Sequence, residues 1–296
     1  MNAATVFGPM RVPFLALVPS CVLLGVATAA LRGPIAWGDA LLAFLGGLAA
    51  HVAVNALNEW DDFRSGVDLA TARTPFSGGS GTLPAHPEAS RGALTVALGS
   101  VIVTATVGVF FLLRWGWGLL PLGLLGLLAI LLYTRWLTRS PLLCLLAPGL
   151  GFGPCMVMGT DYVLAGNYSL AAGIASLVPF FLVSDLLLLN QFPDQAADAA
   201  AGRRHLIIVH GPAVGVRVYG LFLVGAYLSL IVGVLVGVLP WPSLLGLLSV
   251  PLALAAWRGA GRHHANAPAL IPAMGQNVIV NLATPALVAL GIFLGR

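Results

Sequence analysis

The chain is poor in charge and contains no lysine. Only 8% of its 296 residues are charged, whereas a typical soluble domain carries about 25%. Hydrophobic residues make up 59% of the chain, and the mean hydropathy is +0.97. So few charges cannot form a water-exposed surface for a chain of this length. The composition therefore excludes an ordinary soluble protein.

The positive charges are scattered rather than clustered. The net charge is +4 and the sequence pI is near 9.3, but the arginines stand mostly at the ends of apolar runs. This distribution is typical of a membrane protein whose basic residues determine its orientation. We therefore expect no nucleic-acid partner.

Cysteines are equally scarce. The three present, Cys21, Cys144 and Cys155, lie within apolar stretches and show no paired spacing. We expect them to be small buried side chains that provide neither a disulfide framework nor a zinc site.

Long apolar runs are abundant. A membrane-spanning helix needs about 20 mostly apolar residues, and backbone groups in lipid must be paired within the protein, so these runs predict helices. The alternation typical of a membrane β-barrel is absent. Residues 27–29 resemble a signal-peptidase site, but the first run is longer than the apolar part of a signal peptide, and we expect it to be retained. The nine predicted spans are 12–31, 38–60, 92–113, 116–134, 141–160, 169–191, 213–237, 241–257 and 269–294.

Charge falls mainly on one side of this layout. The two connections richest in charge, 61–91 and 192–212, lie on the same side if there are nine spans. Five further arginines fall on that side as well: Arg11, Arg135, Arg139, Arg258 and Arg262. Of the arginines outside the spans, the other side receives only Arg32, Arg114 and Arg296. The positive-inside rule makes the charge-rich side cytoplasmic. We therefore expect an all-α, multi-pass protein of the cell membrane, a single domain over 1–296 with a cytoplasmic N-terminus and about nine helices around a central cavity open to the cytoplasmic face.

The first acidic motif runs from Asn58 to Asp68 at the end of the second span. Helical spacing places His51, Asn55, Asn58 and Asp62 on one stripe. Polar residues inside a membrane are costly and usually face a cavity, which favours a functional role for Asn58 and Asp62. For His51 and Asn55, hydrogen bonding between helices is an equally good interpretation.

The second acidic motif ends the sixth span. Asn190, Asp194 and Asp198 follow an i, i+4, i+8 spacing. Pro193 lacks a backbone N–H and is expected to kink or restart the helix. The Asn-x-x-x-Asp pattern echoes that of the first motif, which indicates either an old duplication or chance.

Two acidic clusters on one membrane face suit a particular chemistry. Mg²⁺ binds hard oxygen ligands, usually one or two carboxylates together with water and substrate phosphate. Two clusters facing each other across a cavity could therefore hold Mg²⁺ and a diphosphate. Arginine donates bidentate hydrogen bonds to phosphate. Four arginines close to the acids are candidates for this role, with surface contacts as the alternative: Arg64, Arg73, Arg203 and Arg204.

These residues resemble the UbiA superfamily of intramembrane prenyltransferases. The segment 58–62, with Gly-Val-Asp at 66–68, is similar to the family's motif after the second helix, and 190–198, with Gly202 and Arg203, is similar to the motif after the sixth. The resemblance covers the whole chain and is greatest to 1,4-dihydroxy-2-naphthoate prenyltransferases. Glu59 stands where the family usually has Asp, Arg203 where Lys is common, and residues 74–81 lack the expected basic stretch.

The resemblance implies a Mg²⁺-dependent transfer of an isoprenyl chain from an isoprenoid diphosphate to a small aromatic acceptor, in contact with membrane lipid. It implies catalytic roles for Asp62, Asp194 and Asp198. The implied metal ligands are Asn58, Glu59, Asp62, Asp68, Asn190, Asp194 and Asp198. The implied substrate-binding residues are Asn58, Arg64, Arg73, Asn190, Arg203 and Arg204.

Several alternatives stay open at this point. The acceptor could instead be a glycerol-phosphate lipid, a haem or a chlorophyllide, and a different class of protein would be an ion-coupled transporter. The aromatic residues Trp60, Phe63 and Phe192 could stabilise a carbocation by cation–π contact or simply anchor the chain at the interface. Asp185 could deprotonate the acceptor or bond a neighbouring helix, and the glycine-rich segment 76–81 could cover the site or act as a linker.

Overall fold

The computed structural model describes residues 3–296, and the secondary structure in this range is helical without strands. The prediction of an all-α fold is confirmed. The elements are α1 (Ala3–Phe7), η1 (Val12–Ala16), α2 (Leu17–Ala30), α3 (Trp37–Ser65), α4 (Val67–Ala70), α5 (Thr82–Ala85), η2 (Pro87–Ala89), α6 (Ser90–Trp115), η3 (Trp117–Leu119), α7 (Leu120–Leu132), η4 (Leu137–Arg139), α8 (Pro141–Leu150), η5 (Gly151–Met158), α9 (Gly159–Ala165), α10 (Leu170–Ala200), α11 (Leu206–His210), α12 (Pro212–Leu235), η6 (Trp241–Ser249), α13 (Val250–His263) and α14 (Ala267–Gly295).

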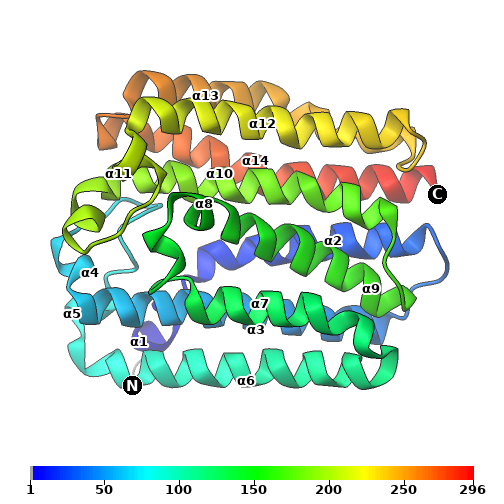
Figure 1. Cartoon of the computed structure of the whole chain (residues 1–296), viewed down its shortest axis with the longest axis horizontal. Helices are drawn as coiled ribbons and strands as arrows, with labels where there is room; N and C mark the ends of the chain where they lie inside the picture. Colours follow the sequence, from blue (N-terminus) through cyan, green and yellow to red (C-terminus); the bar gives the residue numbers. More distant parts are fainter. Residues whose placement is uncertain (1–2) are drawn as a thin grey trace.

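Eight helical segments among the described residues are long and apolar enough to cross a membrane. Each matches a predicted span. The remaining predicted span, 116–134, corresponds to the shorter segment Trp117–Leu132, so the count of nine is approximate. The N-terminal helix α1 and the C-terminus lie at opposite ends of the bundle (Figure 1), as an odd number of crossings requires.

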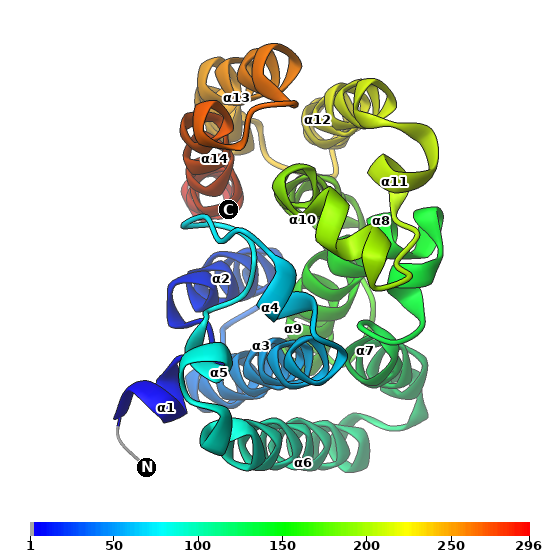
Figure 2. The same cartoon turned by 90° about the vertical axis from the view of Figure 1, so that its left-hand side faces the viewer.

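Helix α10 occupies the centre of the bundle. It packs against α12, α14, α8 and η5, and Figure 2 shows it between the α12–α14 group and the helices around α3. The main apolar core lies along it, with Leu182, Leu188 and Leu189 fully buried. The apolar side chains of α6 and α7, in contrast, are largely exposed, as suits helices that face lipid.

Helices α3 and α10 extend beyond the predicted ends of their spans. Hydropathy marks only the part of a helix that lies in hydrocarbon, whereas the helix itself continues until a residue stops it. For α3 that residue is Gly66, whose φ of +81° is readily adopted by glycine. The acidic residues of the two motifs therefore lie on α3 and α10, apart from Asp68, which lies on the short helix α4. Of the two outcomes expected at Pro193, a kink or a restart of the helix, the restart does not occur, because α10 continues past Pro193 to Ala200.

Close contact between α8 and α10 depends on a glycine. A Cβ built at Gly149 would collide with the carbonyl of Phe180 and the hydroxyl of Ser184. We predict that Gly149→Ala lowers the free energy of unfolding by about 1–3 kcal/mol, the usual effect of overpacking. Gly173→Ala is the matched control, since nothing lies within 4 Å of an added Cβ there. Thermal unfolding followed by circular dichroism in detergent would measure both, and equal shifts would contradict the prediction.

Candidate functional site

One half-buried arginine joins the ends of the two long helices. The guanidinium of Arg203 donates one hydrogen bond to Asp62 on α3 and another to Asp198 on α10 (Nη1 to Oδ1, 2.7 Å). On the other side of Asp198, Nε2 of His205 lies 3.1 Å from Oδ2. The two acidic motifs therefore meet at the end of the bundle that faces the viewer in Figure 2.

A glycine-rich loop also connects the two motifs. This covering loop, residues 73–81, donates the backbone N–H of Gly78 to Asp194 (3.1 Å). Its Ser80 donates the backbone N–H and the hydroxyl to the two carboxylate oxygens of Glu59, both at 2.7 Å. The segment left open as a linker or a cover thus lies over the carboxylates.

Glycine at position 79 permits this close approach. Its φ is +74°, and a Cβ built there would lie 2.7 Å from Oδ1 of Asp68. A larger side chain would push the covering loop away from the carboxylate or strain its backbone. Arg73 helps to hold the loop, because its Nη1 donates to the carbonyl of Ser80 (2.7 Å).

Arg11 is a site residue that the sequence analysis assigned only to membrane orientation. Its Nε donates to Oε1 of Glu59 at 2.6 Å, and the Glu59 side chain is fully buried. The charges of Asp62 and Asp68 also act on Arg11. An arginine before a first span is common in membrane proteins, so no sequence signal separated this one from an orientation signal.

Asp68 lies in an unusual environment for a carboxyl group. Burial, followed by the nearby charges of Glu59 and Asp62, raises the pKa of Asp68 to about 7. In a fraction of the molecules Asp68 therefore keeps its proton at neutral pH, and a cation that binds to this carboxylate would displace that proton.

The oxygen donors suit Mg²⁺ in type. Among the described residues, Oδ2 of Asp68 and Oδ1 of Asp194 are buried and have no hydrogen-bond partner, so they could take a cation. The same part of the chain contains no group of three or more His, Cys, Asp or Glu side chains arranged to hold a metal. Both carboxylate oxygens of Glu59, Asp62 and Asp198 are already bound, by Arg11, Arg203, Asn58, His205 and the covering loop.

The remaining predicted residues differ in how close they come to this cluster. Asn58 donates to Asp62 (3.0 Å) and to Thr134 (3.3 Å), whereas Asn190 is only half-buried on α10. Arg204 is exposed, and its backbone N–H donates to the carbonyl of Thr138 (2.9 Å).

Arg64 and the aromatic residues Trp60, Phe63 and Phe192 make their contacts outside the carboxylate cluster. The guanidinium of Arg64 lies over the ring of Trp60, 4.7 Å from its centroid. Phe63 packs in a small cluster with Leu83, and Phe192 packs in the main core. None of the four lines the cavity described next.

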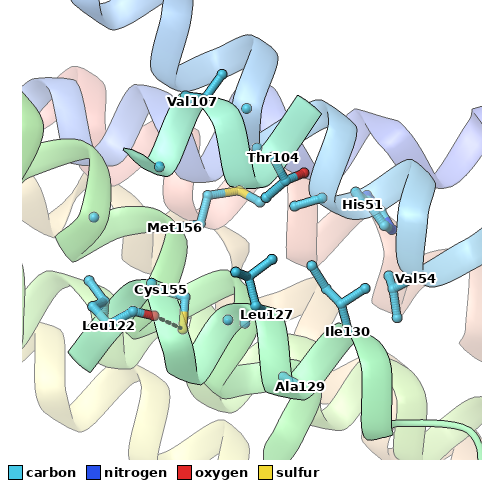
Figure 3. Close-up of a pocket in the computed structure, with 18 of the residues that line it drawn as sticks. His51, Val54, Thr104, Val107, Leu122, Leu127, Ala129, Ile130, Cys155 and Met156 are labelled. Atoms are coloured by element: carbon cyan, nitrogen blue, oxygen red, sulfur yellow. Dashed lines mark hydrogen bonds between the residues drawn. The ribbon is translucent and has the colours of Figure 1, made fainter. Parts of the chain in front are cut away.

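An apolar cavity begins beside the carboxylates. Its volume is about 490 Å³, within the usual range for ligand pockets. One end is polar and includes Arg11, His51 and Asn58. Three of the four residues of the predicted α3 stripe therefore face a cavity, whereas Asp62 does not line it. The rest of the wall is mainly apolar and comes from α3, α6, α7 and the α8–η5–α9 segment. Figure 3 shows side chains such as Leu127, Ile130 and Met156 converging on this space.

The π-helical segment η5 shapes one wall of the cavity. Pro148 and Pro154 interrupt the backbone hydrogen bonds around it. Phe152 from this segment packs edge-on against the ring of His51, with centroids 4.8 Å apart. A second hollow, of about 700 Å³, lies between the N-terminal segment and the covering loop, and Arg11 lines both spaces.

Asp185 lies outside the site. It is fully buried on α10, and its carbonyl accepts a hydrogen bond from Asn277 on α14 (3.3 Å). It does not line the cavity. That hydrogen bond involves the backbone of Asp185, whereas both of its carboxylate oxygens are buried without a hydrogen-bond partner among the described residues, so neither role expected for this side chain is seen.

The whole arrangement is that of an integral-membrane enzyme with an acidic head site and an apolar cavity. Residues 17–277 match the model of the UbiA prenyltransferase family. The chain therefore belongs to the UbiA prenyltransferase family and is a prenyltransferase, as the sequence motifs predicted.

Curated relatives point in the same direction at modest identity. The chain is 28% identical over 281 residues to a 1,4-dihydroxy-2-naphthoate octaprenyltransferase of Mycobacterium tuberculosis, with 93% of this chain and 92% of the relative covered. It is 26% identical over 216 residues to the Bacillus subtilis protein of the same name, covering 71% and 67%. It is 26% identical over 235 residues to a 2-carboxy-1,4-naphthoquinone phytyltransferase of Synechocystis, covering 77% and 73%.

Solved structures share the fold. A UbiA homologue from Aeropyrum pernix superimposes with a TM-score of 0.69 at 17% identity, covering 95% of this chain and 98% of that one. A structure from a study of digeranylgeranylglyceryl phosphate synthase in membranes gives a TM-score of 0.66 at 14% identity, with 97% of each chain covered. These identities show a common fold and leave the acceptor undecided.

The bridging role of Arg203 can be tested against its neighbour. Arg203→Gln would leave Asp62 and Asp198 buried without their shared cation. We predict a loss of about 2–4 kcal/mol in the free energy of unfolding, as for other broken buried ion pairs. Arg204→Gln is the matched control and should change it by no more than about 0.5 kcal/mol, because that side chain is exposed. Similar melting curves for the two variants would show that Arg203 does not hold the helix ends together.

Proposed function

We propose that this enzyme transfers an isoprenyl chain from an isoprenoid diphosphate to an aromatic acceptor of the 1,4-dihydroxy-2-naphthoate type, with Mg²⁺ as cofactor and release of diphosphate. The observation that carries the proposal is the junction of the two acidic motifs directly beside an apolar cavity. An isoprenoid diphosphate carries an anionic head, which would bind at the junction through Mg²⁺ and arginines, and an apolar tail, which would lie in the cavity. Sequence relatives named for naphthoate substrates support the acceptor class.

In this proposal, the carboxylates of Glu59, Asp62, Asp68, Asp194 and Asp198 and the amides of Asn58 and Asn190 supply the metal ligands. Mg²⁺ would act there as a Lewis acid that neutralises charge on the diphosphate. Asp68 and Asp194 each have a free oxygen for this purpose, whereas Glu59 must exchange its present bonds to Arg11 and Ser80.

Arginines would bind the diphosphate oxygens as the carboxylates turn to the metal. Arg11 and Arg203 are the best placed, because they already lie among the acidic side chains. Arg73 could join them through the covering loop. Arg64 and Arg204, the other predicted phosphate ligands, would require a rearrangement of the helix ends.

Between heavy atoms, the proposed reaction breaks one bond and forms one. The allylic C–O bond of the donor breaks, and its electron pair leaves with the diphosphate. A ring carbon of the acceptor forms the new C–C bond, and the proton that it loses passes to a base. The covering loop would exclude water from the allylic cation during this step. We propose that the acceptor approaches through the hollow beneath that loop, where Arg11 faces both spaces.

Adjacent aspartates provide the sharpest test of the metal roles. Asp62 belongs to the buried cluster, whereas Asp61 forms an ion pair with Arg135 (2.8 Å) at the surface. We predict that Asp62→Asn and Asp194→Asn each lower kcat at least about 100-fold, the usual cost of removing a group that stabilises developing charge. Asp61→Asn should stay within about fivefold of wild type, because surface ion pairs contribute little. Diphosphate release and product mass, measured with Mg²⁺, a prenyl diphosphate and the naphthoate, would decide.

Metal dependence should follow the same residues. Treatment with EDTA is expected to abolish transfer, and added Mg²⁺ to restore it, because the proposed head site has carboxylates in excess of its arginines. Full activity after chelation would contradict the cofactor assignment.

The arginine distribution supports a cytoplasmic site. Arg11, Arg135 and Arg203 lie with the carboxylates at one end of the bundle, while Arg32 and Arg114 are bound to Asp161 and Asp39 at the other. We propose that the carboxylate end and the N-terminus face the cytoplasm.

A further inference from the structure

One carboxylate of the acidic cluster is held from two sides. Oδ1 of Asp198 accepts a hydrogen bond from Arg203 (2.7 Å), and Oδ2 lies 3.1 Å from Nε2 of His205. An ionised carboxylate oxygen can only accept, so Nε2 of His205 carries the hydrogen of this bond. Nδ1 of His205 is buried without a partner among the described residues. Within that part of the chain, the imidazole therefore makes its hydrogen bond to Asp198 alone.

The backbone around His205 keeps its ring in place. The residue is 1% exposed and directly precedes α11, and its carbonyl accepts the backbone N–H of Ile208 (3.1 Å). The helix α11 packs against α8, α10 and α12 (Figure 2). Its Ile207 is fully buried, and the carbonyl of Ile207 accepts a hydrogen bond from Gln195 of α10 (3.4 Å). The ring therefore cannot leave Asp198 unless α11 is displaced from its neighbours.

Arg203 is the more exchangeable of the two partners of Asp198. Its side chain is 16% exposed, compared with 2% for His205, and its guanidinium also binds Asp62. An arginine side chain has more rotatable bonds than a histidine side chain, so it can change partner without a movement of the backbone. If Arg203 turns to a diphosphate, Oδ1 of Asp198 loses its partner while Oδ2 keeps His205. One oxygen of this carboxylate is then released and the other stays held.

We propose that His205 is a positioning residue: it holds Oδ2 of Asp198 so that Oδ1 is free for Mg²⁺ once Arg203 binds the diphosphate. The inference rests on the proposed function, in which Asp198 is a metal ligand. Without the imidazole, the carboxylate could rotate and offer both oxygens to the fork of Arg203, and such a bidentate pair competes with the metal. Groups that orient a metal ligand in this way typically change metal affinity by about 10- to 100-fold.

Three substitutions separate the hydrogen bond from the packing of the ring. His205→Gln keeps an N–H donor at a similar reach, whereas His205→Met has no donor and the amide of His205→Asn is too short to reach Oδ2. His210→Met is the matched control, because His210 is exposed at the other end of α11. Binding of Mn²⁺, which accepts the same oxygen ligands as Mg²⁺, would be titrated by electron paramagnetic resonance with inorganic diphosphate present. The half-saturating Mg²⁺ concentration and the KM for the prenyl donor would be measured during turnover.

We expect His205→Met and His205→Asn to raise the Kd for Mn²⁺ and the half-saturating Mg²⁺ concentration at least about tenfold, and His205→Gln and the control to stay within about threefold of wild type. The KM for the donor at saturating Mg²⁺ should change little in all four variants.

An unchanged Kd in the Met and Asn variants would overturn the inference. An equal rise in the Gln variant would overturn it too, because the ring would then act by packing alone. If the Met variant does not fold, the comparison of Asn with Gln decides. Wild-type protein that binds no Mn²⁺ would refute the metal assignment of the proposed function, and the inference with it. Failure of prenyl transfer alone is told apart, because the Mn²⁺ titration contains neither donor nor acceptor.

Discussion

Neutralisation of buried carboxylates is the constraint on which the rest of the structure depends. Five acidic side chains from two distant parts of the chain lie together at one end of the bundle, and such a concentration of negative charge is not stable by itself. Arg203 balances Asp62 and Asp198, and Arg11 balances Glu59. These ion pairs fix where α3, α10 and the N-terminal segment meet. Because arginine side chains rather than covalent links neutralise these carboxylates, a metal ion and a diphosphate can replace those ion pairs.

The sequence predicted the architecture well because its physical signals are strong. Apolar runs define helices in lipid, and a run of that kind has few other solutions. The ends of the helices were less accurate, since polar residues such as Asp62 and Asp198 continue each helix beyond its apolar run. The continuation of α10 past Pro193 has a related cause. A proline late in a long, packed helix loses one hydrogen bond, whereas tertiary contacts keep the rest of the helix in place.

The candidate site could be predicted only in part. Helical spacing correctly placed His51, Asn55 and Asn58 on one face, and that face lines the cavity. Spacing says nothing, however, about partners that come from elsewhere in the chain. Arg11 and Ser80 join the acidic cluster from distant parts of the chain, whereas His205 joins it from the loop that follows Asp198. The sequence neighbourhoods of these three residues resemble an orientation signal, a linker and a loop. Conversely, Arg64 stands next to the acids in sequence but stacks on Trp60 instead.

The limited length of Trp117–Leu132 has a consequence for the surrounding membrane. Its sixteen residues span about 24 Å, several ångströms less than a typical hydrocarbon core of about 30 Å. Unless neighbouring helices shield this segment, the bilayer beside it must become thinner, at a cost in free energy. Turnover in vesicles of different acyl length should therefore respond to bilayer thickness.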